Sequence, residues 1–372
     1  MRYWAQPGML TTAAASVWLA VLRFGGLTAI AGASDARVVP VNLSSAAITI
    51  NGFSLGGNLW PSPAMPPTVR ETGMTLLRLW IDNGVGGADS PINLSQEEAD
   101  DWANKTVAAH GNLASFHSFG ADAASSKVEI LLAGGGFGTP YMVPGKNHVF
   151  DPQRIPDVAL MWAAVVHRMA APDCLGAPPA FIELSNEPNG HWNTFVDPAV
   201  WAKLACAVRV ALDARGLQAT GISGPGVSLG SSKPFLEALA SENSIHRCIA
   251  MISVHTWEDN TPNGPHEMAG MLAKYVALRE QFDANHSKRW VATEFGSRTN
   301  QIAGHTFNHT VGQCYDQTYT QTRLPADAEV LSAEYGTRVA AFTLLHMNAG
   351  FDAALYCEPD LTLHGQCWFV RA

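Results

Sequence analysis

Short apolar runs alternate with longer mixed segments along this chain, from about residue 47 to residue 356. Each run has roughly four to eight residues and is rich in Val, Ile, Leu and aromatic side chains, as buried strands are. The pattern therefore predicts eight strands, at residues 47–51, 75–82, 127–133, 181–187, 220–225, 249–255, 289–296 and 351–356.

The segments between the strands are helical in pattern or polar. The clearest one begins at Pro156, which suits a first helical turn, and repeats apolar residues at Val158, Met161, Trp162 and Val165. We predict helices at residues 156–170, 198–216, 267–284 and 331–349, and a polar, partly helical stretch at residues 96–119.

Strands that alternate with helices predict an α/β protein whose parallel sheet closes into a (β/α)8 TIM barrel. The alternative is a doubly wound open sheet, but Gly52, Gly56 and Gly57 lack the spacing of a phosphate-binding fingerprint. Only residues 357–372 follow the last predicted strand, which is short for a turn and a full helix. We therefore expect the final helix of the barrel to be missing or truncated.

The composition favours a large core and disfavours nucleic acid as a partner. Of 372 residues, 47% are hydrophobic and 15% are charged, a charge fraction well below the usual value of about 25%. The formal net charge is -9 and no basic run is present, so the electrostatic footprint of a nucleic-acid-binding protein is missing.

The N-terminus is typical of a targeting segment. Arg2 precedes an apolar run over residues 9–33, which closes on the small-residue triplet Ala-Gly-Ala and is interrupted by Arg23. The interruption argues against a lipid-spanning helix, and no later stretch is long enough to be one. We predict a signal peptide at 1–33, a single domain at 40–372 and a secreted protein, with a retained anchor as the alternative.

The cysteines agree with export. An even number of them in an exported chain favours disulfides, and Cys357 with Cys367 is the simplest pair because the loop between them is short. Buried free thiols are the alternative, and no pair has the spacing of a zinc site. The six cysteines are Cys174, Cys206, Cys248, Cys314, Cys357 and Cys367. Five glycosylation sequons, which predict a glycoprotein, begin at Asn42, Asn93, Asn104, Asn285 and Asn308.

Two glutamates stand where apolar strands give way to loops. Glu187 follows the strand that starts at Phe181, and Pro188 cannot continue a strand ladder. Glu294 lies in a second segment of the same form, which ends on Gly296. The carboxyl ends of barrel strands carry the functional groups, and a pair of carboxylates is what cleavage of a glycosidic bond requires. The alternative is that both are surface carboxylates.

Other polar residues fall on the same predicted strand ends. Arg78, Asn186 and His255 are candidates for contacts with a ligand or with the glutamates, and Glu183 is predicted to be a buried structural acid in need of a partner. Arg78 could be that partner instead, and His255 could be a core histidine. Aromatic residues that could stack on a sugar, or simply pack, are Trp60, Trp80, Trp192, Trp257 and Tyr356.

The segment 297–330 after Glu294 is long and rich in Gln, Thr and His. We predict a loop that walls one side of the cleft. His305 and His309 are four residues apart within it, but the helical pattern is weak, so we interpret them as part of a solvated loop and not as metal ligands.

Three motifs in order carry a resemblance to a known family: residues 182–189 with Asn-Glu-Pro, His255-x-Trp257, and residues 290–296 with Thr-Glu-Phe-Gly. They resemble the retaining glycoside hydrolases whose catalytic glutamates lie on strands four and seven of a TIM barrel. This clan includes cellulases, mannanases, β-xylosidases and glucosylceramidases. The resemblance covers roughly residues 45 to 360.

The resemblance implies a role for each residue. Glu187 would be the general acid/base, Glu294 the nucleophile, and Arg78 the cation beside the nucleophile. Asn186 would donate to the sugar 2-hydroxyl, and His255 would contact the nucleophile side of the site. The family usually has a tryptophan on strand eight, where the nearest aromatic residue here is Tyr356.

The expected function is therefore that of a secreted retaining β-glycoside hydrolase acting by double displacement on a polysaccharide or glycoconjugate, with no metal or organic cofactor. Retention requires carboxyl groups about 5–5.5 Å apart. The alternatives are a glycan-binding protein on a degenerate barrel, an inverting enzyme with carboxyl groups about 6.5–9.5 Å apart, and a transglycosylase. The sequence does not indicate an oligomeric state.

Overall fold

The computed structural model describes residues 54–59, 74–81, 85–109, 117, 120, 128–146, 148–190, 193–228, 232–241, 244–259, 264–302, 305–311 and 333–356. Side chains are described in these ranges except for 54–59, 258–259, 264–267, 297–302, 305–311, 333–339 and 356. The predicted signal peptide, the predicted strand at 47–51, Trp60, Trp192 and the segment 357–372 lie outside the described residues.

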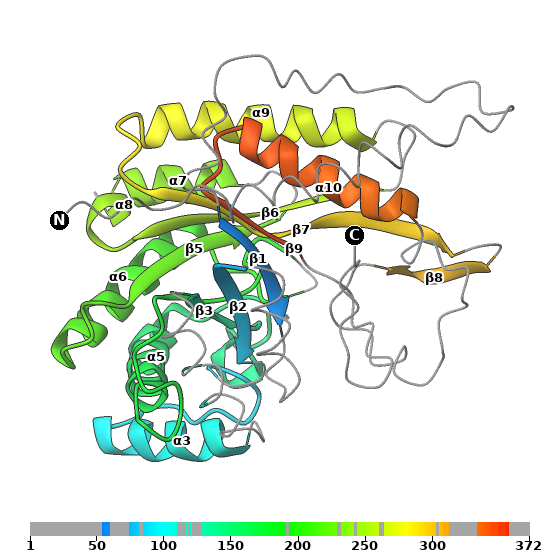
Figure 1. Cartoon of the computed structure of the whole chain (residues 1–372). Coiled ribbons are helices and arrows are strands. Elements are labelled where there is room, and N and C mark those ends of the chain that lie inside the picture. Colours follow the sequence, from blue (N-terminus) through cyan, green and yellow to red (C-terminus); the bar gives the residue numbers. More distant parts are fainter. Residues whose placement is uncertain are drawn as a thin grey trace, which may run out of the picture.

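The described strands form a closed parallel barrel (Figure 1). The ring closes because β9 pairs with both β1 and β7, while β6 pairs with both β5 and β7. An open doubly wound sheet is therefore wrong, and the fold is the predicted TIM barrel. The barrel strands are β1 (Ser54–Leu59), β2 (Leu76–Ile81), β3 (Glu129–Gly134), β4 (Phe181–Glu183), β5 (Gly221–Val227), β6 (Met251–Asp259), β7 (Arg289–Ile302) and β9 (Ala353–Tyr356).

Helices connect the strands and cover the barrel, with α9 and α10 packed side by side on one flank (Figure 1). The helix α6 shows why they start where they do: Asp197 accepts hydrogen bonds from Ala199 N and Val200 N, and Pro198 fills the first turn. The partly helical stretch and the four predicted helices are confirmed as α3 (Gln96–Ala109), α5 (Ile155–Met169), α6 (Pro198–Ala214), α9 (Gly264–Phe282) and α10 (Ala333–Asn348). Further short helices are η1 (Thr139–Tyr141), η2 (Pro152–Arg154), α7 (Ser232–Ser241) and α8 (Ser244–Arg247).

Several predicted boundaries are wrong. The strand β1 lies in the glycine-rich stretch that we expected to follow a strand, because glycines can pair in a ladder without giving an apolar pattern. The strand β7 continues to Ile302 and pairs in antiparallel fashion with β8 (His305–Val311), so His305 and His309 lie on a strand and not in a loop. An antiparallel hairpin need not be buried on both faces, so its sequence carries no apolar run.

The interior of the barrel changes from apolar to polar toward the carboxyl ends of the strands. Side chains two residues apart on a strand share a face. Leu76, Met251 and Val291 belong to the small apolar cluster inside the barrel, and two positions further along the same strands are Arg78, Ser253 and Thr293, all fully buried. The polar layer needs partners, since a buried charge without them is costly.

One disulfide links the outer helices. Cys206 on α6 is bonded to Cys248, just beyond α8, and Cys174 is a buried free thiol whose pKa burial raises to about 11. Both alternatives for the cysteines therefore occur in the described part of the chain, whereas the predicted pair Cys357–Cys367 lies outside it. None of the described helices has the length and apolar character needed to cross a bilayer.

Candidate active site

Glu187 lies in the turn after β4, at the carboxyl end of the barrel. The strand ends at Glu183, four residues earlier than predicted, and the backbone of Glu187 lies in the left-handed region with φ 43°. Neighbouring strands hold the turn: Asn186 N donates to Gly135 O at 3.4 Å, and Glu187 N donates to Gly226 O at 3.1 Å. The Glu187 side chain is thereby buried against the mouth of the barrel, with 8% of its surface exposed.

Glu294 is aimed inward by an irregularity in β7. The register with β6 shifts so that Val254 pairs with Ala292 and His255 pairs with Glu294. The extra residue, Thr293, also contacts the interior, where its hydroxyl donates to Oε2 of Glu183 at 2.9 Å. A bulge of this kind lets two successive side chains face one side of a sheet.

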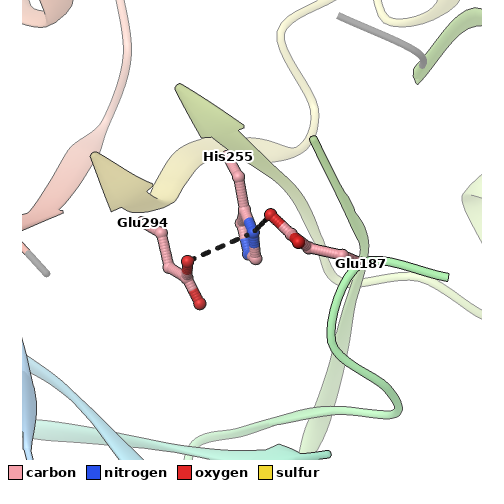
Figure 2. Close-up of side chains that lie close together, drawn as sticks. All are labelled: Glu187, His255 and Glu294. Atoms are coloured by element: carbon pink, nitrogen blue, oxygen red, sulfur yellow. Dashed lines mark hydrogen bonds and ion pairs between the residues drawn. The ribbon is translucent and has the colours of Figure 1, made fainter. Parts of the chain in front are cut away.

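His255 lies between the two glutamates (Figure 2). Its Nδ1 is 3.0 Å from Oε1 of Glu187 and 3.5 Å from Oε2 of Glu294. Burial alone would lower the pKa of His255, but the negative charges of Glu294 and Glu187 outweigh it and raise the pKa above its ordinary value. The imidazolium form is therefore favoured, and it supplies positive charge between the carboxylates.

Arg78 serves two carboxylates at once. Nη1 donates to Oε1 of Glu294 at 2.6 Å, while Nη2 donates to Oε1 of Glu183 and, at 2.9 Å, to Oδ1 of Asn186. Burial works against the guanidinium charge, but Glu183 and Glu294 more than offset it and raise the pKa of Arg78. Arg78 is therefore a partner of both Glu294 and Glu183, the two roles that the sequence offered as alternatives.

The aromatic candidates lie in different surroundings. Nε1 of Trp257, which is half-buried, donates to Oε2 of Glu294 at 3.1 Å. The Trp80 ring packs on the Arg78 guanidinium at 4.1 Å and is 3% exposed, a cation–π contact that supports the arginine. The backbone of Tyr356 pairs with Gly57 at the end of β9, and its side chain lies outside the description, as Trp192 does. Sugar stacking by these aromatics stays a prediction.

The roles of Thr293 and Gly226 in the site were not predicted from the sequence. Strand alternation would send Thr293 and Glu294 to opposite faces, so nothing in the local pattern indicates that both point inward. Gly226 has φ 62°, and its only signal was its place directly after Pro225 at the end of a predicted strand.

The cluster of Glu187, His255 and Glu294 has donor atoms within 4.8 Å of one another, a spacing that could also suit a divalent cation. Arg78 already places a positive charge 2.6 Å from Oε1 of Glu294, and a metal ion bound to the same carboxylate would be repelled by it. The residues therefore fit a carboxylate pair with organic cations better than a metal centre.

No protein-family model and no curated protein sequence matches the chain. Solved structures do match it. A glucosidase from Croceicoccus marinus aligns with a TM-score of 0.52 and 14% identity, over 82% of this chain and 59% of that one. SrfJ from Salmonella typhimurium aligns with a TM-score of 0.55 and 10% identity, over 82% and 64%.

A GH39 enzyme from Xanthomonas axonopodis pv. citri aligns with a TM-score of 0.51 and 12% identity, over 83% of this chain and 58% of that one. This chain spans about three fifths of the length of these structures. At 10–14% identity the likeness shows the fold alone, and that fold is the TIM barrel that the motif resemblance implied.

Proposed function

We propose that the chain is a retaining β-glycoside hydrolase acting on a polysaccharide or glycoconjugate. The observation that carries the proposal is the approach of Glu187 and Glu294, whose nearest carboxylate oxygens lie within 4.8 Å of each other. Retaining enzymes have carboxyl groups about 5–5.5 Å apart, whereas inverting enzymes need about 6.5–9.5 Å to admit a water. The short separation favours retention.

In the first step a carboxylate oxygen of Glu294 bonds to the anomeric carbon while the bond from that carbon to the leaving oxygen breaks. Glu187 gives its proton to the leaving oxygen. In the second step Glu187 takes a proton from water, the water oxygen bonds to the anomeric carbon, and Glu294 leaves as a carboxylate. Atoms and charges balance, and no redox partner is needed.

The neighbours of the pair suit these steps. Arg78 holds Oε1 of Glu294 and Trp257 holds Oε2, so the nucleophile keeps one orientation. His255 holds Oε1 of Glu187, and the general acid would carry its proton on Oε2. The side-chain oxygen Oδ1 of Asn186 accepts from Arg78, which orients the side-chain NH₂ as the donor to a sugar 2-hydroxyl.

Further observations support a carbohydrate substrate and a location outside the cell. The matched glucosidase acts on a glucoside by its name, which is consistent with a carbohydrate substrate here. We also propose that the protein is secreted: the N-terminal segment has the pattern of a signal peptide, and the disulfide between Cys206 and Cys248 requires an oxidising compartment to persist.

The test compares wild type with Glu294→Gln and Glu187→Gln on a panel of aryl β-glycosides, with proton NMR of the first product anomer. Glu97→Gln, which changes an acidic residue of the first turn of α3, is the matched control. We expect a β-anomer first, a loss of at least about 10³-fold in Glu294→Gln, and wild-type rates in the control.

Equal turnover by wild type and Glu294→Gln would reject the nucleophile assignment, and an α-anomer as first product would reject retention. Saturable glycan binding by wild type without product would identify a binding protein. A transglycosylase would give a larger glycoside when a sugar acceptor is added.

A further inference from the structure

We propose that Glu183, which takes no part in the two chemical steps, is a positioning residue. It shares Arg78 with Glu294, and it contacts the residues that hold the two catalytic glutamates in place, Thr293 beside Glu294 and Gly226 beside Glu187. The inference rests on the proposed function. Its main measurement, however, needs no turnover, so the two proposals can fail separately.

The Glu183 carboxylate is tied to the Glu294 side of the site. The side chain is fully buried at the last position of β4. Oε1 accepts from Nη2 of Arg78, whose Nη1 holds Glu294, and Oε2 accepts from the hydroxyl of Thr293 at 2.9 Å. One carboxylate thus holds both the cation that binds Glu294 and the residue next to Glu294 in the bulge.

The same carboxylate supports the Glu187 side. A Cβ at Gly226 would lie 2.9 Å from the carboxylate carbon of Glu183, so Glu183 packs directly on this glycine. The carbonyl of Gly226 accepts the backbone N–H of Glu187 at 3.1 Å. Only a residue without a side chain can have φ 62° and lie against Glu183 in this way, which explains the glycine.

His255 completes the arrangement. While Nδ1 faces the catalytic pair, Nε2 lies on the other side of the ring, 4.0 Å from Oε1 of Glu183. This buried nitrogen has no hydrogen-bond partner among the described residues. The Glu183 charge therefore acts on the imidazolium from the side opposite Glu187, at a distance where a buried ion pair is strong.

The charges around Glu183 favour its ionised form. Arg78 approaches from β2 and His255 from β6, with the carboxylates of Glu294 and Glu187 beyond them, while the paired neighbours on β3 and β5 are Ala133 and Ser223. Burial raises the pKa of Glu183, but Arg78 and then His255 outweigh it and lower the pKa below its ordinary value. The same coupling must favour the cationic form of His255.

The test uses Glu183→Gln, which keeps the shape and removes the charge, beside Thr293→Val, which removes one hydrogen bond and keeps the charge. The imidazole titration of His255 is followed by NMR without substrate. We expect the His255 pKa to fall by about one unit or more in Glu183→Gln and to change by less than about 0.3 unit in Thr293→Val. An unchanged His255 titration in a folded Glu183→Gln protein overturns the proposal.

Kinetics supply a second readout. Because Glu183 touches no substrate, we expect kcat to fall by at least about tenfold in Glu183→Gln while KM stays within about threefold, and a smaller loss of kcat in Thr293→Val. Equal losses in the two variants would indicate a merely structural role. If Glu183→Gln does not fold, the carboxyl carbon of Glu183 is titrated in wild type, and a protonated carboxyl at neutral pH overturns the proposal.

Discussion

Arg78 and Glu294 form a buried ion pair in which Nη1 of the arginine donates to Oε1 of the glutamate at 2.6 Å, with side-chain exposures of 0% and 6%. The pair is not isolated, since the second nitrogen of the guanidinium donates to Glu183. A planar fork can serve two carboxylates in fixed directions, which a point charge on a flexible stem cannot do. The geometry therefore requires an arginine, and another cationic side chain would not satisfy it.

Arg78→Lys should lower kcat/KM by about 10²- to 10³-fold, because an ammonium cannot hold Glu183 and Glu294 together and leaves one buried carboxylate without its partner. Steady-state kinetics on an aryl β-glycoside measure the effect, with circular dichroism to show that the variant folds. The matched control is Arg289→Lys, since Arg289 pairs with Glu129 at the opposite end of the barrel. Wild-type kcat/KM in a folded Arg78→Lys protein would contradict the assignment.

The elements that could be predicted are those whose burial produces a pattern of apolar residues in the local sequence. The strand β2 is buried at every position, so its sequence is an apolar run interrupted by Arg78, and α5 repeats its apolar face at helical spacing. The strands β1 and β8 left no such pattern. The first depends on glycines that pair with β2 and β9, and the second on antiparallel pairing with β7.

The candidate site divides in the same way. Glu187 and Glu294 could be placed together because a barrel brings the carboxyl ends of its strands to one mouth. The double partnership of Arg78 could not be predicted, since it depends on how closely the side chains of β2, β4 and β7 approach one another inside the barrel. The inward turn of Thr293 depends on a bulge that simple alternation contradicts.

Gly296→Ala should disturb Glu294, the proposed nucleophile, through Trp257. A Cβ at Gly296 would lie 2.6 Å from the Trp257 ring, too close for the ring to stay where its Nε1 donates to Glu294 at 3.1 Å. We expect kcat/KM to fall by about 10- to 100-fold as the hydrogen bond is lost.

The control for this substitution is Gly270→Ala on α9, where an added Cβ meets nothing within 4 Å. Alanine in the helix should raise the free energy of unfolding by about 1 kcal/mol and leave kcat/KM unchanged. Denaturant titrations and kinetics on both variants measure the two effects. A Gly296→Ala protein with the wild-type kcat/KM would show that the Trp257 contact is dispensable.

Removal of the disulfide should destabilise the protein without changing its chemistry. Cys206 and Cys248 are separated by 42 positions in the sequence, and closing a loop of that length stabilises a fold by about 2–4 kcal/mol. We expect the double alanine variant to lose about that much, and reductant to lower the stability of wild type to the same value. Cys174→Ala removes a free thiol and is the control. Reductant should lower the stability of this variant by the same amount as that of wild type. A double variant as stable as wild type would contradict the prediction.

His346 should make stability depend on pH between about 4 and 6.5. The side chain is fully buried, its Nδ1 donates to Phe342 O at 2.7 Å, and its Nε2 accepts from the Thr256 hydroxyl at 2.7 Å. Burial lowers its pKa to about 4, although the bond to Phe342 O works in the opposite direction. In the unfolded chain the histidine pKa is about 6.5, so the unfolded chain binds a proton in a pH range where folded His346 stays neutral. The free energy of unfolding therefore falls as the pH drops from 6.5 to 4.

The full loss is about 3 kcal/mol, from the difference between the two pKa values. Urea titrations at several pH values measure it. In His346→Gln the side chain cannot titrate. The slope of the free energy of unfolding against pH should therefore be smaller than in wild type over this range, by the contribution of the one proton that unfolded His346 binds. The matched control is His286→Asn, which changes an exposed histidine paired with Glu280. A His346→Gln protein with an unchanged slope would show that His346 is protonated equally in the folded and unfolded chain.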